Sequence, residues 1–191
     1  GIVAAYRDRL PIPPDIEAVH INEGGTPLVH LPAVSDQKRN IDVFAKCEGL
    51  NPTGSFKDRG MTVALSMALN NGSKAVICAS TGNTSASASA YGAYSQIPVT
   101  VVIPEKSIAM GKLVQARAHG AKILAVNGNF DEALCLVREI SNKGSLTLVN
   151  SVNPYRLEGQ KTAAFEIIED NKNTEESSAL GSLGLKPKPV H

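Results

Sequence analysis

A lysine stands where a loop turns into a predicted helix, in the stretch NPTGSFKDRG (51–60). The positive end of a helix dipole disfavours a cation, so Lys57 is an unexpected residue at this position. We interpret the helix start, the neighbouring cation Arg59 and the aromatic ring of Phe56 as three influences that lower the pKa of the Lys57 amine. A lysine with a lowered pKa is a nucleophile that can form a Schiff base with a carbonyl compound. Taken alone the stretch is a weak signal, because most lysines are solvated surface groups.

Hydroxyl and amide side chains gather in a second stretch, ASTGNTSASA (79–88), directly after an apolar run. Its polar turn contains Ser80, Thr81, Asn83 and Thr84. A helix that starts there offers unpaired backbone N–H groups, which favour an anion such as a carboxylate. The predicted helix over 85–94 is almost entirely Ser, Ala and Gly, so another group can approach it closely. A capped helix packed tightly on a sheet explains the same residues equally well.

A third stretch, NSVNPYRLEGQKT (150–162), also follows an apolar run. It places Asn150, Ser151 and Arg156 within one predicted loop. The guanidinium group is a fork of donors that matches phosphate, and Ser and Asn add neutral donors. An ordinary turn before a helix is the competing interpretation, and this stretch alone favours that interpretation.

Four short, β-branched apolar runs alternate with helical patterns in the middle of the chain. The predicted strands are 74–80, 98–104, 121–126 and 145–150, with a weaker candidate at 41–46. Nearly continuous apolar runs indicate strands that are covered on both faces. Repetition of strand and helix at this spacing predicts right-handed crossovers and a parallel sheet. We therefore predict an α/β fold of three layers, in which ligands bind beyond the carboxyl ends of the strands.

The ends of the predicted elements carry recognisable residue types. Asn129 is a predicted N-cap, followed by a helix with one apolar face. The segment before the sheet is rich in Pro and Gly and is predicted to be an extended approach to it. Residues 171–191 contain few apolar side chains and no periodicity, which predicts a disordered tail.

Composition narrows the class of protein. The 191 residues carry 19 basic and 18 acidic side chains, with no basic stripe, which argues against nucleic acid or an anionic membrane as a partner. No apolar run reaches the roughly 20 residues that a membrane span needs. The three cysteines are far apart and odd in number, which favours reduced thiols over a disulfide or a zinc site. A cytoplasmic protein without a bound metal fits these observations best.

The three stretches, together with EGGTPLV (23–29), resemble threonine synthases in their order and spacing. Those enzymes belong to the fold type II, or tryptophan synthase β-like, family that depends on pyridoxal 5'-phosphate. The resemblance extends from about Tyr6 to Glu169. The lysine motif is shared with threonine dehydratases, whereas the stretch 150–162 is more specific and favours threonine synthase.

The resemblance implies a role for each matching residue. Lys57 would hold the cofactor as a Schiff base and shuttle protons, Phe56 would lie beside the ring, and Asn83 would bind the 3-hydroxyl group. The substrate carboxylate would be bound by Ser80, Thr81 and Thr84, and the substrate phosphate by Asn150, Ser151 and Arg156. The implied reaction converts O-phospho-L-homoserine and water to L-threonine and phosphate, in an enzyme that is a homodimer at full length.

The resemblance covers only the N-terminal half of such an enzyme and fades after Asp170. It implies that 1–54 and 145–170 belong to a large cofactor domain, that 55–144 form a small α/β domain, and that 171–191 match nothing. Two alternatives stay open. One is a threonine or serine dehydratase or a cysteine synthase, whose substrates carry no phosphate. The other is an inactive fragment that keeps part of the site.

Overall fold

The computed structural model describes residues 1–105, 110–144 and 146–171. The chain divides into two compact units. The first combines Gly1–Thr26 with Glu48–Thr162, and the second combines Pro27–Cys47 with the described residues from Ala163 onward. The predicted domain bounds at 55 and 144 stay a prediction, because compact units within one structure do not identify domains that move.

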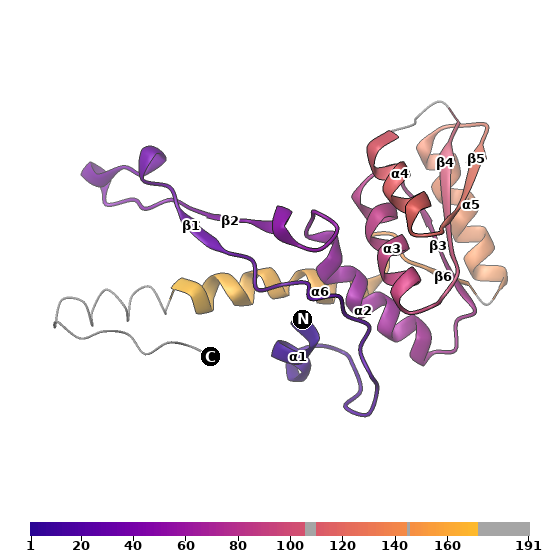
Figure 1. The fold of residues 1–191 in the computed structure, drawn as a ribbon, viewed down its shortest axis with the longest axis horizontal. Helices are drawn as coiled ribbons and strands as arrows, with labels where there is room; N and C mark the ends of the chain where they lie inside the picture. Colours follow the sequence, from indigo (N-terminus) through magenta and orange to yellow (C-terminus); the bar gives the residue numbers. More distant parts are fainter. Residues whose placement is uncertain (106–109, 145, 172–191) are drawn as a thin grey trace. The chain divides into compact units, whose positions relative to one another are not determined.

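The first unit contains a parallel sheet of four strands in the order β5-β4-β3-β6 (Figure 1). Its strands are β3 (Ala75–Ala79), β4 (Val99–Pro104), β5 (Lys122–Val126) and β6 (Leu146–Leu148). In the register of β3 with β4, Cys78 lies opposite Val101, and in the register of β3 with β6, Ile77 lies opposite Leu148. Each strand lies within a predicted apolar run, so the predicted α/β fold with a parallel sheet is confirmed.

Helices cover both faces of this sheet. The helices are α2 (Lys57–Asn70), α3 (Asn83–Tyr94), α4 (Met110–Ala118), α5 (Phe130–Lys143) and α6 (Pro154–Gln160). Side chains of α2, α3 and α4 share one core with Val76, Cys78 and Val101 of the sheet. On the other face, Ala133 and Val137 of α5 pack against Ile77, Ala79 and Val102. The alternation of inward residues along β3 therefore serves two cores, as expected for a central parallel strand.

Two sequence-based expectations about burial and backbone were wrong. β5 is not covered on both faces, because it lies at the edge of the sheet and Leu124 is 51% exposed. The N-terminal segment is not extended throughout, because Ile2–Tyr6 form helix α1, with Ile2 and Tyr6 buried on one side. Short 3-10 helices follow at Arg7–Arg9, Pro32–Val34, Gln37–Arg39 and Glu48–Leu50.

The second unit is built on an antiparallel pair of strands. β1 (Leu28–His30) pairs with β2 (Phe44–Lys46), and residues 163–171 are helical. The ammonium group of Lys46 lies 2.9 Å from a carboxylate oxygen of Glu166 and 2.8 Å from one of Asp170. The predicted disordered tail begins at Asn171, and its residues 172–191 lie outside the described residues. Within the described ranges, no helix is long and apolar enough to cross a bilayer.

Asn129 caps α5 as predicted, and its removal should weaken that helix. Its side-chain oxygen accepts from the Glu132 N–H at 3.0 Å, while the Glu132 carboxylate accepts from the Asn129 N–H at 2.7 Å. We expect Asn129→Ala to lower the free energy of unfolding by ~1 kcal/mol. Urea unfolding of this variant and of Asn127→Ala, an exposed asparagine in the same loop, measures the difference. Equal losses in both variants would show that the cap contributes nothing.

Candidate functional site

The stretches at 80–84 and 150–156 meet at the carboxyl ends of the strands, because β3 and β6 are parallel neighbours. The pairing continues past the end of β6, where the Val149 N–H donates to the Ile77 carbonyl at 3.0 Å. The next residue, Asn150, is buried and bonds through its side chain to the backbone of Ala79. The predicted meeting of two ligand stretches at the carboxyl ends of strands is therefore present in the structure.

In the turn after β3, one polar side chain holds the backbone in place and three others make no hydrogen bond within the described part of the chain. The hydroxyl oxygen of Ser80 accepts from the N–H groups of Gly82 at 3.2 Å and Ser85 at 3.3 Å, which holds the turn in shape. Thr81, Asn83 and Thr84 are half-buried, and their side chains have no hydrogen bond within the described part of the chain. Their polar groups are therefore available to a ligand at the start of α3.

Lys57 is the first residue of α2, and its amine lies 4.3 Å from the centre of the Phe56 ring. Burial lowers the pKa of Lys57, and the positive charge of Arg156 lowers it further. Among the described residues its ammonium has neither a hydrogen bond nor an ion pair. A half-buried amine of this kind loses its proton more easily than a solvated lysine and suits covalent attachment of a carbonyl compound.

Two of the three influences predicted to act on Lys57 were wrong. Arg59 is fully buried and bound to Glu48 through Nε–Oε2 at 2.8 Å and Nη2–Oε1 at 2.7 Å, so its charge is neutralised nearby. The face of the Phe56 ring attracts a cation and therefore favours the protonated amine. The neighbouring cation is Arg156 in place of Arg59, because helix α6 brings residue 156 towards the start of α2.

The loop before Lys57 is held by the buried carboxylate of Asp58. It accepts from the Thr53 N–H at 2.7 Å and from the Thr53 hydroxyl at 2.6 Å. It also accepts from the Ser87 hydroxyl of α3 at 2.6 Å, which ties the lysine-bearing helix to the helix that starts at residue 83. Thr53 and Ser87 were not among the residues predicted from the sequence to support the site. The repeated serines of SASASA (85–90) were a possible signal, since serine in a buried helix needs a partner.

Arg156 lies in α6 and not in a loop as predicted, because the Asn153 side chain caps the helix by accepting from the Tyr155 N–H. Its side chain is fully buried, and Nη1 donates to the Val149 carbonyl at 2.7 Å. Within the described residues, Nε and Nη2 have no hydrogen-bond partner. Burial lowers the pKa of Arg156 to about 10. A buried guanidinium group without a carboxylate partner is costly and would be stabilised by an anion.

Two glycines allow α2 and α6 to cross closely, and one of them also makes room for this guanidinium group. A Cβ atom at Gly60 would lie 2.7 Å from Arg156 Nε and 2.6 Å from the Arg156 carbonyl oxygen. A Cβ atom at Gly159 would lie 2.0 Å from the Arg59 carbonyl oxygen. The amide nitrogen of Gln160 faces the same space and also lacks a partner in the described chain. Neither glycine nor Gln160 was predicted to belong to the site, because a helix crossing is not visible in a linear pattern of residues.

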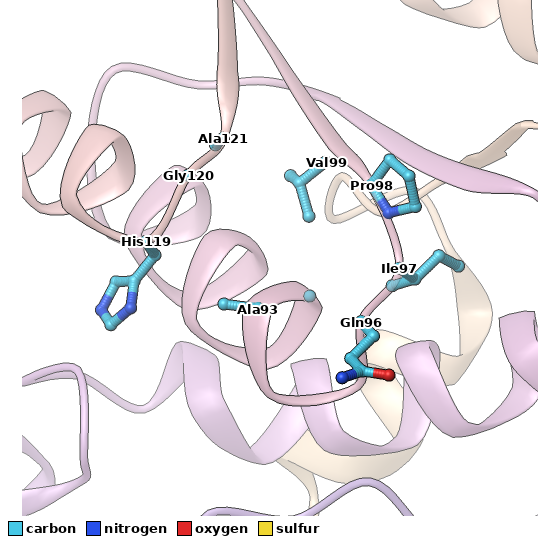
Figure 2. A pocket seen from close by; sticks show the side chains of 9 residues that line it. Ala93, Gln96, Ile97, Pro98, Val99, His119, Gly120 and Ala121 are labelled. Atoms are coloured by element: carbon cyan, nitrogen blue, oxygen red, sulfur yellow. The ribbon is translucent and has the colours of Figure 1, made fainter.

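A separate pocket of about 300 Å³ lies at the opposite end of the strands (Figure 2). It is lined by residues that precede β4 and β5, including Gln96, Pro98, His119 and Gly120. Parallel sheets present their ligand crevice at the carboxyl ends of the strands, so this pocket is not the predicted site. Among the described residues, no group of three or more His, Cys, Asp or Glu side chains could hold a metal ion, and the three cysteines are unpaired.

Residues 19–180 match the family of pyridoxal-phosphate dependent enzymes. The chain therefore belongs to this family, and its cofactor is pyridoxal phosphate. The half-buried Lys57 amine and the unpaired polar groups of Thr81, Asn83 and Thr84 fit the covalent and ring-side contacts that such a cofactor needs. The match runs past Asp170, where the resemblance was expected to fade.

Within the family, the chain is similar to threonine synthases. It is 57% identical over 170 residues to the threonine synthase of Mycobacterium leprae (strain TN), a match that covers 88% of this chain and 47% of that protein. It is 54% identical over 170 residues to the threonine synthase of Synechocystis sp. (strain ATCC 27184 / PCC 6803 / Kazusa), with 88% and 44% covered. The chain spans about half the length of the curated relatives it matches.

Solved structures agree with the fold type II assignment. Threonine deaminase isoform 2 from Solanum lycopersicum aligns with a TM-score of 0.68 and 26% identity, over 88% of this chain and 45% of that one. Cysteine synthase from Entamoeba histolytica aligns with a TM-score of 0.69 and 24% identity, over 78% and 47%. The second likeness shows the fold alone. These likenesses confirm the fold class, and the family match confirms the cofactor that the sequence resemblance implied.

Proposed function

We propose that this protein is the lysine-bearing part of a threonine synthase, which converts O-phospho-L-homoserine and water to L-threonine and phosphate. One observation carries the choice of a phosphorylated substrate. The buried Arg156 guanidinium group has two N–H-bearing nitrogens without a partner among the described residues, and its charge acts on Lys57. A phosphate group at this position would neutralise a buried charge that otherwise destabilises the fold.

The cofactor would be held by three residues of the lysine loop and the adjacent turn. Lys57 would bind it covalently through Nζ, Phe56 would lie beside its ring, and Asn83 would donate to its 3-hydroxyl oxygen. When bound, pyridoxal phosphate supplies an electron sink for negative charge that develops on substrate carbons. The lowered pKa of Lys57 suits its Nζ to take a proton from the substrate and to return it.

The substrate would be held at both ends, by the turn at 80–84 and by residues 150–156 at the carboxyl ends of the strands. Thr81 and Thr84 would donate to its carboxylate, with Ser80 setting the shape of the turn. Arg156 and the exposed Ser151 would donate to its phosphate. Asn150 would add its one remaining N–H, since the other donates to the Ala79 carbonyl. Two anchors would orient the bond to the phosphate towards the Lys57 amine and direct its elimination.

A threonine or serine dehydratase is the second candidate, favoured by the structural likeness to threonine deaminase. That reaction involves no substrate phosphate and leaves the unpaired Arg156 donors without a task. An inactive fragment is the third candidate, because the chain spans about half the length of its curated relatives. Cytoplasmic location, a homodimer at full length, and the absence of nucleic-acid or membrane partners complete the proposal.

The purified chain tests these candidates directly. It is mixed with pyridoxal phosphate and either O-phospho-L-homoserine or L-threonine, and the formation of threonine or of an oxo acid is measured. Threonine formation well above the rate of free pyridoxal phosphate supports the synthase, and oxo acid formation supports the dehydratase. Borohydride fixation of the cofactor at Lys57 without either product identifies an inactive fragment, and fixation elsewhere contradicts the assignment of the site.

Arg156→Ala should weaken use of the phosphorylated substrate. We expect kcat/KM for O-phospho-L-homoserine to fall by the equivalent of ~2–4 kcal/mol, because a charge-assisted contact is lost. Arg156→Lys should recover only part of the loss, since an ammonium group cannot bind two phosphate oxygens as a fork. Arg138→Ala, which removes an exposed arginine of α5, is the matched control. An unchanged kcat/KM in Arg156→Ala would rule out the phosphate role.

A further inference from the structure

The two loops proposed to hold opposite ends of the substrate are joined by one side chain. The Asn150 oxygen accepts from the Ala79 N–H at 2.9 Å, and the Asn150 nitrogen donates to the Ala79 carbonyl at 2.8 Å. The last backbone bond between these two segments runs from the Val149 N–H to the Ile77 carbonyl, and the Asn150 amide extends the pairing with β3 beyond it. A primary amide offers one donor and one acceptor side by side, which matches what a paired backbone would present.

The connection continues from Ala79 into the turn at 80–84, called the carboxylate turn because it is proposed to bind the substrate carboxylate. Ser80 follows Ala79 directly, and its hydroxyl oxygen accepts from the N–H groups of Gly82 and Ser85. Ser151 follows Asn150 directly and is exposed at the sheet edge. The start of α3 is therefore linked to residues 150–153, called the phosphate loop. The link consists of the hydrogen bonds of Asn150 with Ala79, the peptide bond from Ala79 to Ser80, and the hydrogen bonds of Ser80 within the turn. Both Asn150 and Ala79 are buried, so water cannot replace these bonds without opening the edge of the sheet.

We propose that Asn150 is a positioning residue that fixes the spacing between the carboxylate turn (80–84) and the phosphate loop (150–153). This inference rests on the proposed function for the identity of the two ligand groups. It assigns Asn150 a task that does not require contact with the phosphate. A substrate that bridges the two loops is oriented correctly only while the Asn150–Ala79 pair is intact. Occupation of the phosphate loop is also transmitted through this pair to the turn.

The first test needs no ligand. Backbone amide exchange is measured by NMR on the 191-residue chain and on Asn150→Ala. In the unsubstituted chain the Ala79 N–H should exchange as slowly as the core amide of Ile77. In Asn150→Ala we expect exchange at Ala79 and through the turn to Ser85 to rise on the order of tenfold or more. Asn153→Ala is the matched control, because it also removes two side-chain hydrogen bonds, to the Leu148 carbonyl at 2.8 Å and from the Tyr155 N–H at 2.9 Å, neither of which involves β3.

The second test uses inorganic phosphate as the probe and follows the amide signals of Thr81, Asn83 and Thr84. Phosphate should shift these signals in the unsubstituted chain. Ser151→Ala should need more phosphate for the same final shift, because it removes a donor and leaves the connection intact. Asn150→Ala also loses one proposed donor to phosphate, so a higher phosphate concentration should be needed to shift the amide of Ser151, and at that concentration the turn should still not respond. A merely structural role for Asn150 would not separate these two responses.

Specific outcomes overturn the inference. Rapid exchange of the Ala79 N–H in the unsubstituted chain would show that the pair does not persist in solution, and this measurement stands even if Asn150→Ala fails to fold. Unchanged turn exchange in a folded Asn150→Ala chain would also overturn it. A chain that shows the exchange pattern but no response to phosphate would contradict the proposed function and leave the positioning role supported.

Discussion

Lys57→Ala is expected to abolish covalent attachment of the cofactor and to reduce any threonine-forming rate by roughly 10³-fold or more. Lys57 is a half-buried lysine at the start of α2 with a lowered pKa and no ion pair within the described residues. Lys46, by contrast, forms ion pairs with the carboxylates of Glu166 and Asp170. Borohydride reduction followed by mass spectrometry of peptides identifies the modified lysine, independently of turnover. Lys74→Ala, at an exposed lysine, is the control.

Attachment of the cofactor to Lys57 should depend on pH in a defined direction. Burial and the charge of Arg156 lower the pKa of Lys57, so the neutral amine is present at lower pH than for a solvated lysine. Attachment should therefore increase as pH rises through this lowered pKa. Arg156→Ala removes a positive neighbour, which raises the pKa of Lys57 and should shift the profile to higher pH. Attachment to a different lysine, or an identical profile in both proteins, would contradict the described site.

Gly159→Ala is expected to separate α2 from α6 and to lower the free energy of unfolding by about 3 kcal/mol or more. The added Cβ would lie 2.0 Å from the Arg59 carbonyl oxygen and 2.8 Å from the Gly60 Cα. These are backbone atoms of a helix and cannot rotate away as a side chain could. The two helices must therefore move apart, which would also displace Lys57 at the start of α2. Thermal and urea unfolding measure the loss of stability.

The control for this prediction is another glycine in a helix. A Cβ at Gly111 of α4 would meet nothing within 4 Å, so Gly111→Ala should be neutral or stabilising by up to about 1 kcal/mol. The comparison separates the general effect of replacing a helical glycine from the steric contact that is present at Gly159 and absent at Gly111. A Gly159→Ala chain as stable as Gly111→Ala would show that the close crossing of α2 and α6 does not exist in solution.

Local patterns in the sequence were sufficient for the elements of the sheet. The apolar runs located β3, β4, β5 and β6, and the strand–helix alternation predicted their parallel arrangement. Asn129 marked the start of α5 because a capping box involves residues only three apart. The same local reasoning placed the lysine and both ligand stretches at loop-to-helix transitions. These features depend on neighbours in the chain, which a linear pattern records.

Burial depended on the order of the strands, which local patterns do not contain. β5 was predicted to be covered on both faces from its apolar residues, yet it forms an edge of the sheet. Helix α1 was missed because its stability comes from Ile2, Val3 and Tyr6 packing inward, and five residues are too few to form a helix without tertiary contacts.

The sequence by itself predicted a site made of Lys57, the turn at 80–84 and the stretch at 150–156. Only the tertiary structure decided which charges act on them. Arg59 lies two residues from Lys57 but is bound by Glu48, whereas Arg156 is distant in the chain and acts on Lys57 across the crossing of α2 and α6. The Asn150 side chain is likewise bound to Ala79 because β6 lies beside β3. Electrostatic and hydrogen-bonding partners are set by distance in space, and the sheet order and the helix crossing set those distances.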